Sequence, residues 1–229
     1  MPVSEVYLID CIEFMKDKPD NVFDFAIVDP PYGIGADNKN SVKKLQSKKS
    51  ASLSKNYGSQ KWDNNIPTDE YFTELFRVSK NQIIWGANYY GLIGGMIYWH
   101  KNVTMPTYSD GEIAFCSLIN SIRFFEYTWH GMIQQNMADK ENRIHPTQKP
   151  VALYKWLLQN YAKPGDKIFD SQMGSQSSRI AAYQLGFDYW GCEIDKDYFR
   201  DGCKRFDAVI HKKDLTDYDS QKKEEGKLF

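Results

Sequence analysis

The sequence has few cysteines, and their spacing is not that of metal ligands. Its 229 residues include four cysteines, without a C-x-x-C pair or a histidine at ligand spacing: Cys11, Cys116, Cys192 and Cys203. Zinc sites and disulfide frameworks depend on such closely spaced groups. We therefore expect neither a metal ion nor a disulfide framework.

Long apolar runs and an excess of one charge are lacking as well. The longest uncharged stretch, residues 81–99, contains four glycines, which suits strands joined by turns better than a membrane span. The 29 Lys and Arg residues oppose 30 Asp and Glu residues, for a net charge of -1, so whole-chain charge indicates no particular partner. The N-terminus has no basic segment followed by an apolar run. These features predict a cytoplasmic protein that does not contact a membrane.

The chain has the length of one domain with a sizeable insertion. Short apolar runs that stop at polar residues predict strands at 22–28 and 167–169, with further strand candidates at 6–9, 82–85, 96–99 and 188–192. Helical patterns lie between them, at 69–79, 151–161 and 177–185. This alternation predicts an open α/β sheet. Ligands bind such sheets at the carboxyl ends of the strands, where Asp10, Asp29, Asp170 and Glu193 fall.

One segment departs from this pattern in composition. Residues 35–61 hold seven lysines, six serines and a single acidic residue, Asp37, with almost nothing apolar to bury. We interpret it as a mobile loop. A solubilising surface insertion and a phosphate-contacting loop both fit this composition, and the position just after residue 32 favours the second.

The most specific motif is the run Asp29-Pro30-Pro31-Tyr32, at the end of the first sharply bounded strand. Two prolines remove two backbone donors and fix two φ angles, so the run predicts a rigid rim. The Asp29 carboxylate and the Pro30 carbonyl can each accept a hydrogen from an exocyclic amino group, while Tyr32 stacks on the ring that carries it. The run therefore predicts a site for a planar, amino-substituted ring.

A second candidate site is the small polar loop at residues 170–178, between a strand and a helix. Its backbone amides and the start of the helix are available to a polar ligand. Glu193 ends the next strand, where an acidic side chain takes the two hydroxyls of a ribose. This order is typical of a nucleoside cofactor site, although a loop with one glycine also fits an ordinary turn. The turn at 142–150 likewise fits a structural role as well as a functional one.

Three runs, taken in order, resemble motifs of the S-adenosylmethionine-dependent DNA amino-methyltransferases. They are the Asp-Pro-Pro-Tyr run at 29–32, His-Pro-Thr-Gln-Lys-Pro at 145–150 and Phe-Asp-x-x-Met-Gly-Ser at 169–175. The catalytic motif precedes the cofactor motifs, as in the permuted β group of adenine-N6 and cytosine-N4 methyltransferases. The resemblance implies a Rossmann-like open mixed sheet with helices on both faces, in circularly permuted order, with a small inserted target-recognition region.

The resemblance also divides the chain. It implies a catalytic half at residues 1–34 and 62–90, interrupted by a Lys/Ser-rich mobile loop at 35–61. A target-recognition region at 91–142 and a cofactor-binding half at 143–210 follow, and the charged tail at 211–229 has no assigned function.

Roles for single residues follow from the same resemblance. The catalytic residues are Asp29, Pro30, Pro31 and Tyr32, which hold a base flipped out of DNA. The cofactor, S-adenosyl-L-methionine, meets Asp170 and Gly174 at its methionine end, Glu193 at its ribose and Asp10 near its adenine, while Thr147, Gln148 and Lys149 approach its amino-acid end. Ser175 is a further cofactor-binding residue.

The reaction implied is methyl transfer to an exocyclic amine in DNA, with Asp29 ionised. Asp at the first motif position favours adenine N6 over cytosine N4, because Ser is commoner in N4 enzymes. The glycine loop departs from the family pattern: Ser171 and Gln172 replace Pro and Phe, and Gln176 replaces the second glycine. A side chain at 176 is expected to weaken or block cofactor binding. A non-catalytic nucleic-acid-binding relative, a cytosine-N4 enzyme and an RNA methyltransferase therefore stay open as alternatives.

The expected partner is double-stranded DNA, in a bacterium or a phage-infected cell. A homodimer and a cognate restriction enzyme are further candidates, taken from the family. We expect DNA contacts from six basic residues, Lys43, Lys44, Lys48, Lys49, Lys101 and Arg123, and in the target-recognition region also from Trp99, His100 and Trp129.

Overall fold

The computed structural model describes residues 1–35, 63–103, 109–130 and 133–225, and the side chains of the last helix only as far as His211. Its main sheet has eight strands in the order β1-β10-β9-β2-β3-β5-β4-β6. In chain order these are β1 Ser4–Leu8, β2 Phe23–Val28, β3 Ser79–Trp85, β4 Gly95–His100, β5 Gly111–Cys116, β6 Ile122–Glu126, β9 Lys167–Asp170 and β10 Asp188–Glu193. A small antiparallel pair, β7 Trp129–His130 and β8 Ile133–Gln134, stands apart.

The strand directions confirm the expected open mixed sheet. Five neighbouring strands, from β1 to β3 in the sheet order, run parallel, whereas β5 lies antiparallel to both β3 and β4. Leu8 pairs with Glu193 and Gly191 with Asp170, so the carboxyl ends of β1, β10 and β9 meet at one edge. The end of β2, before Asp29, reaches the same edge. Candidate ligand-binding residues from distant parts of the chain are thereby brought together.

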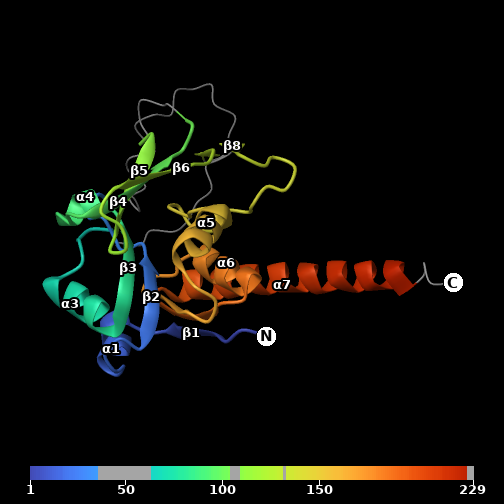
Figure 1. Cartoon of the computed structure of the whole chain (residues 1–229), viewed down its shortest axis with the longest axis horizontal. Helices are drawn as coiled ribbons and strands as arrows, with labels where there is room; N and C mark the ends of the chain where they lie inside the picture. The colour runs from blue at the N-terminus through green and yellow to red at the C-terminus, as the bar shows by residue number, and fades with distance from the viewer. Residues whose placement is uncertain (36–62, 104–108, 131–132, 226–229) are drawn as a thin grey trace.

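Helices cover both faces of the sheet, as predicted (Figure 1). They are α1 Cys11–Lys16, α3 Asp69–Val78, α4 Ala87–Tyr90, α5 Val151–Tyr161, α6 Ser177–Leu185 and α7 Lys196–Glu225. Phe25 and Ile27 pack in the layer with α5 and α6, while Ala26 and Val28 pack in the layer with α1 and α3. Because successive side chains point to opposite faces, a strand covered on both sides is apolar throughout. This explains the unbroken apolar run before Asp29.

Two aromatic residues that we expected to reach DNA belong to the core. Trp99 is 1% exposed and Trp129 is 5% exposed. Their indole N–H groups donate to the carbonyl oxygens of Tyr127 and Gln148, at 3.1 and 2.8 Å. The prediction for these two residues is wrong, because the alternation along β4 turns Trp99 inward and Trp129 packs with it in the same cluster.

Residues 36–62 lie outside the described part of the chain, together with the lysines at 43, 44, 48 and 49. The two residues that flank this segment meet: the Gly35 amide donates to the Asp63 carbonyl oxygen at 2.9 Å. The two residues that flank the segment therefore lie together at one point beside the Asp-Pro-Pro-Tyr run.

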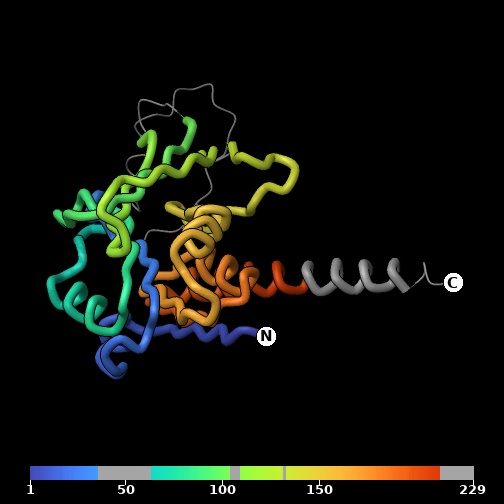
Figure 2. The backbone as a smooth tube through the Cα atoms, viewed as in Figure 1, coloured from blue at the N-terminus to red at the C-terminus, as the bar shows by residue number. Residues whose placement is uncertain are grey.

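The last helix, α7, extends beyond the body of the protein (Figure 1). In Figure 2 the N-terminal strand β1, in dark blue, lies close to the orange part of the chain, where it pairs with β10. Its backbone is helical through Glu225, so the charged tail at 211–229 begins as helix. In the described residues no helix is long and apolar enough to cross a membrane.

Candidate active site

Asp29 lies directly after β2, and both of its carboxylate oxygens have partners. Oδ1 accepts a hydrogen bond from the Tyr32 hydroxyl at 2.7 Å. Oδ2 is 2.5 Å from the Nζ of Lys149, whose side chain is 3% exposed. The Asp29 carboxylate is therefore bound by one hydroxyl of its own motif and by one ammonium group from outside the motif.

The backbone of the Asp-Pro-Pro-Tyr run is held by two side chains that sequence reasoning missed. The Asp63 Oδ1 accepts from the amides of Tyr32 and Gly33, at 2.7 and 2.9 Å. The Tyr90 hydroxyl donates to the carbonyl oxygens of Pro30 and Pro31, at 2.7 and 2.8 Å. Asp63 is separated from the run by thirty residues, so no local pattern could have revealed it. The Pro30 carbonyl, expected to accept from a base, already accepts from Tyr90.

The Tyr32 ring lies against the turn after β3. A Cβ atom at Gly86 would lie 2.4 Å from a ring carbon of Tyr32, and Gly86 has φ +79°, so both the close approach and the backbone conformation require glycine. Tyr32 stacks on Tyr89, with ring centroids 4.8 Å apart. Its stacking on a flipped base stays a prediction.

Lys149 joins Asp29 to a second carboxylate, Glu112, on β5. The Lys149 Nζ lies 3.0 Å from Glu112 Oε2 and 3.1 Å from the Tyr32 hydroxyl. The other Glu112 oxygen, Oε1, is 2.5 Å from the Nζ of Lys101. These four charged residues, Asp29, Lys149, Glu112 and Lys101, form what we call the ion chain. The structure thus places Lys149 at the catalytic motif, and its expected contact with the cofactor stays a prediction.

The ion chain sets the charge state of its carboxylates. Burial raises the pKa of Asp29 above its usual value, and Lys149 opposes this shift. Burial would also raise the pKa of Glu112, but two lysines outweigh it and lower this pKa to about 2. The neighbouring carboxylates raise the pKa of Lys149 despite its burial. Two ammonium groups and two carboxylates balance each other in a region with little access to water.

The loop after β9 holds its carboxylates with neutral donors. The Asp170 Oδ2 accepts from the Ser178 hydroxyl at 2.6 Å and its Oδ1 from the Gln172 amide at 3.1 Å. Glu193 accepts from the amides of Gly174 and Asp195, both at 2.9 Å. Burial raises the pKa of Asp170 to about 7 and also raises that of Glu193. Asp29 contributes to the shift at Asp170, which places the two sites close enough to interact.

The Gln176 side chain turns away from this loop. Its Nε2 lies 3.4 Å from the Phe199 carbonyl oxygen, and its Oε1 accepts from Arg179 at 2.9 Å. Gly202 of α7 provides the space for this side chain, because a Cβ at Gly202 would lie 2.7 Å from Gln176 Nε2. Gln176 keeps the left-handed φ of 59° that suits glycine, but its side chain fills space beneath α7. The expected loss of cofactor affinity through a side chain at 176 stays a prediction.

The other predicted cofactor residues differ in how available they are. Gln148 is 3% exposed, and its Oε1 accepts from the Ile144 amide. The Thr147 hydroxyl lies 3.1 Å from His145 Nδ1. Ser175 is buried beside Ser177, and Asp10 caps α1 by accepting from the Ile12 amide at 2.8 Å. Their cofactor contacts stay predictions.

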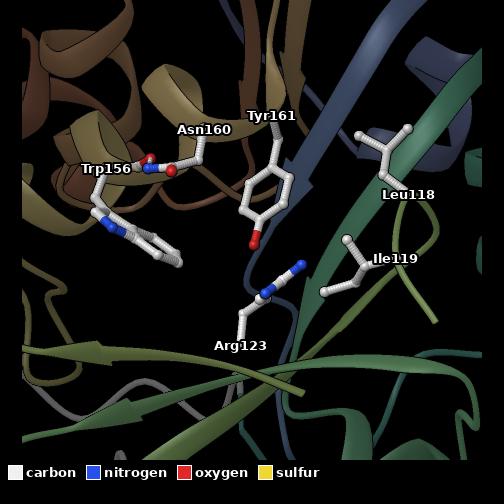
Figure 3. A pocket seen from close by; sticks show the side chains of 6 residues that line it. All are labelled: Leu118, Ile119, Arg123, Trp156, Asn160 and Tyr161. Atoms are coloured by element: carbon white, nitrogen blue, oxygen red, sulfur yellow. Dashed lines mark hydrogen bonds between the residues drawn. The ribbon is translucent and has the colours of Figure 1, made fainter. Parts of the chain in front are cut away.

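Lys101 and Arg123, both predicted to contact DNA, lie toward opposite ends of the neighbouring parallel strands β4 and β6. Lys101 directly follows β4 and belongs to the ion chain, on the side of Asp29. Arg123 pairs with Ile97 near the start of β6 and faces Tyr161 across a hollow of about 480 Å³ (Figure 3), lined by Leu118, Ile119, Arg123, Trp156, Asn160 and Tyr161. A contact of Arg123 with DNA stays a prediction.

Comparisons with known proteins agree with this geometry. The model of a family described as DNA methylase, N6_N4_Mtase, matches residues 91–204. The chain belongs to this DNA methylase family. YubD of Escherichia coli (strain K12), named as a candidate methylase, is 26% identical over 87% of this chain and 88% of its own. The DNA adenine methyltransferase YhdJ of the same organism is 37% identical over 33% of this chain and 25% of its own.

A solved structure shows the same fold for this methylase. The crystal structure of the M1.HpyAVI complex with S-adenosylmethionine has a TM-score of 0.53 and 20% sequence identity, and covers 88% of this chain and 98% of that one. The PvuII DNA methyltransferase, described as cytosine-N4-specific, has a TM-score of 0.57 and 12% sequence identity, and covers 90% of this chain and 87% of that one. These likenesses confirm the expected methyltransferase fold.

Proposed function

We propose that the protein transfers a methyl group from S-adenosylmethionine to the exocyclic N6 of an adenine that is flipped out of double-stranded DNA. The observation that carries the proposal is the position of Asp29, a half-buried carboxylate paired to the buried Lys149 at the same sheet edge as Asp170 and Glu193. Membership of the N6/N4 methylase family limits the acceptor to an exocyclic amine of DNA.

The residues at the end of β9 and β10 fit the cofactor. Asp170 and Glu193 are 1% and 9% exposed, and both accept only neutral donors within the described residues. Two such carboxylates suit an ammonium group and a pair of ribose hydroxyls. When bound, S-adenosylmethionine supplies an electrophilic methyl group on a sulfonium ion. We assign Asp170 and Gly174 to its methionine end and Glu193 to its ribose.

The Asp-Pro-Pro-Tyr run supplies the contacts for the base. The ionised Asp29 carboxylate accepts a hydrogen bond from the amine. The amine gains positive charge as it attacks the methyl group, so this hydrogen bond strengthens in the transition state. Tyr32 and Pro30 fix the plane of the ring. A base cannot meet the cofactor inside the duplex, and its extrusion costs a few kcal/mol, which pocket contacts offset in part.

Asp at position 29 and the similarity to YhdJ favour adenine over cytosine. Nucleoside mass spectrometry on DNA from methylation-deficient cells tests the proposal, with the wild-type protein, Asp29→Ala and, as a control on the same strand, Asp24→Asn. We expect N6-methyladenine with the wild type and the control and its absence with Asp29→Ala. N4-methylcytosine would keep the mechanism and change the base, and no modified base with the wild type would contradict the proposal.

A further inference from the structure

Glu112 has no role in the motifs of the sequence, yet it shares Lys149 with Asp29. The Lys149 Nζ lies 2.5 Å from Asp29 Oδ2 and 3.0 Å from Glu112 Oε2, so one ammonium group bridges two carboxylates. The side chains of Asp29 and Glu112 are 16% and 20% exposed, against 3% for Lys149. The lysine is thus the most enclosed member of the ion chain.

Both Asp29 carboxylate oxygens already have a partner. Oδ1 accepts from Tyr32, and Oδ2 is paired with Lys149. An amine that binds at Oδ2 competes with the Lys149 ammonium for this oxygen and weakens the ion pair, and a buried ammonium group is costly without a charged partner. The rings of Tyr32 and Trp85, with centroids 5.5 and 5.4 Å from Nζ, lie beside the ammonium group and offer no carboxylate in place of Asp29.

Glu112 offers the displaced ammonium a second partner without a change of burial. Its Oε2 is already within bonding distance, so Lys149 needs to shift its contacts rather than leave the pocket. Lys101, which neutralises the other oxygen of Glu112, has a side chain that is 19% exposed and can turn toward water as Lys149 approaches. The total charge of the ion chain stays constant during this exchange.

We propose that Glu112 is a positioning residue that takes over Lys149 when the amine of the target base binds Asp29. This inference rests on the proposed function and adds a residue from β5 to its machinery. Without DNA, Lys149 is paired with the catalytic carboxylate of Asp29. While the amine is bound there, Glu112 keeps Lys149 in an ion pair nearby, so that Lys149 returns to Asp29 when the product leaves.

The test compares methyl transfer by purified full-length variants. Tritiated S-adenosylmethionine and unmethylated chromosomal DNA from methylation-deficient cells are the probes, at pH 8.5, because burial raises the pKa of Asp29 and a higher pH favours its ionised form. The variants are Glu112→Gln, Glu112→Asp, Lys149→Met, the double variant Glu112→Gln/Lys149→Met and, as a control on β6, Glu126→Gln. Thermal unfolding and calorimetry with S-adenosylmethionine check that each variant folds and retains its cofactor half.

Glu112→Gln leaves Lys149 with a single charged partner, so the amine competes less well for Asp29. We expect the KM for DNA to rise about tenfold with a smaller change in kcat, and Glu112→Asp to stay within about threefold of the wild type because it keeps the charge. In the Lys149→Met background Glu112→Gln should change KM less than about twofold, since no lysine is left to compete.

Two results would overturn the inference. The first is a Glu112→Gln protein that matches Glu126→Gln, and the second is a Glu112→Gln effect of equal size with and without Lys149. If the wild-type protein transferred no methyl group to any DNA tested, the result would instead contradict the proposed function. Failure of the inference and failure of the proposed function are thus distinguishable.

Discussion

The two buried acidic sites of this protein solve the same electrostatic problem in different ways. Asp29 is neutralised by an ammonium group of the protein itself, 2.5 Å away, whereas Asp170 and Glu193 are held by hydroxyl and amide donors that carry no charge. The first site is complete before a substrate arrives. At the second site burial raises the pKa of Asp170 to about 7, and in the described residues only neutral donors oppose this shift. The difference indicates that a ligand at Asp29 has to compete with the ammonium group already there, whereas the site of Asp170 and Glu193 can bind a cationic ligand directly.

Loss of the Asp29 charge should have the largest effect on methyl transfer and should leave the second site unchanged. Asp29→Asn keeps the shape of the side chain but removes the charge that stabilises the developing ammonium ion of the product. We expect kcat/KM for methyl transfer to fall about 10²–10⁴-fold. Calorimetric affinity for S-adenosylmethionine should change less than about twofold, because the cofactor carboxylates are untouched. A parallel loss of cofactor affinity would show that the two sites are not separate, and Asp24→Asn, on the same strand, provides the control.

Removal of the internal cation should make the first site resemble the second. Lys149→Met leaves Asp29 buried without its ammonium partner, and breaking such a pair costs about 3–5 kcal/mol of unfolding free energy. The pKa of Asp29 should rise further. Activity that needs the ionised form is lost as the pH falls through this pKa, so the acidic limb of the pH–rate profile should move to higher pH. Lys155→Met, on the helix α5 that begins two residues after Lys149, should leave the limb in place, and an unchanged limb in Lys149→Met would refute the charge-balancing role.

The second site should reveal its missing cation in the pH dependence of cofactor binding. A cationic ligand binds the ionised Asp170 better, so its affinity rises as the pH rises through the pKa of about 7. Between pH 7 and pH 6 we expect calorimetry to show a loss of about fivefold in affinity for S-adenosylmethionine. Asp170→Asn should bind more weakly and lose this dependence, while the exposed Asp17→Asn should behave as the wild type. A flat profile for the wild type would exclude Asp170 as the titrating group.

The smallest effect should come from Gln176, which borders the second site but packs under α7. Gly202→Ala brings a Cβ to 2.7 Å from Gln176 Nε2, so we expect a loss of about 1–3 kcal/mol in unfolding free energy. Gln176→Gly should relieve that crowding in the double variant, which a double-mutant cycle by urea unfolding measures. Gln176→Gly alone should change cofactor affinity by less than about threefold. A gain of tenfold or more would mean that the side chain does obstruct the loop.

The sequence predicted the sheet well because the signals for it are local. The apolar run of β2 ends at Asp29, and the helix after residue 150 begins after a proline, as both patterns indicated. The ion chain could not be predicted, because Lys149 meets Asp29 and Glu112 through the folding together of three distant segments. Lys149 was assigned to the cofactor by its motif alone. Glu112 lies in a region that we expected to recognise DNA, and nothing in its neighbours along the chain marks it.

The hydrogen bond between the Gly35 amide and the Asp63 carbonyl oxygen fixes the distance between the two residues that flank 36–62. Asp63 also holds the amides of Tyr32 and Gly33 with its side chain, so a single residue ties the chain after position 62 to the catalytic run. A linker that replaces 36–62 has only to span the short distance from Gly35 to Asp63. Such a variant keeps Asp63 in place and removes the lysines at 43, 44, 48 and 49, so their predicted share in DNA affinity can be measured separately from the chemistry.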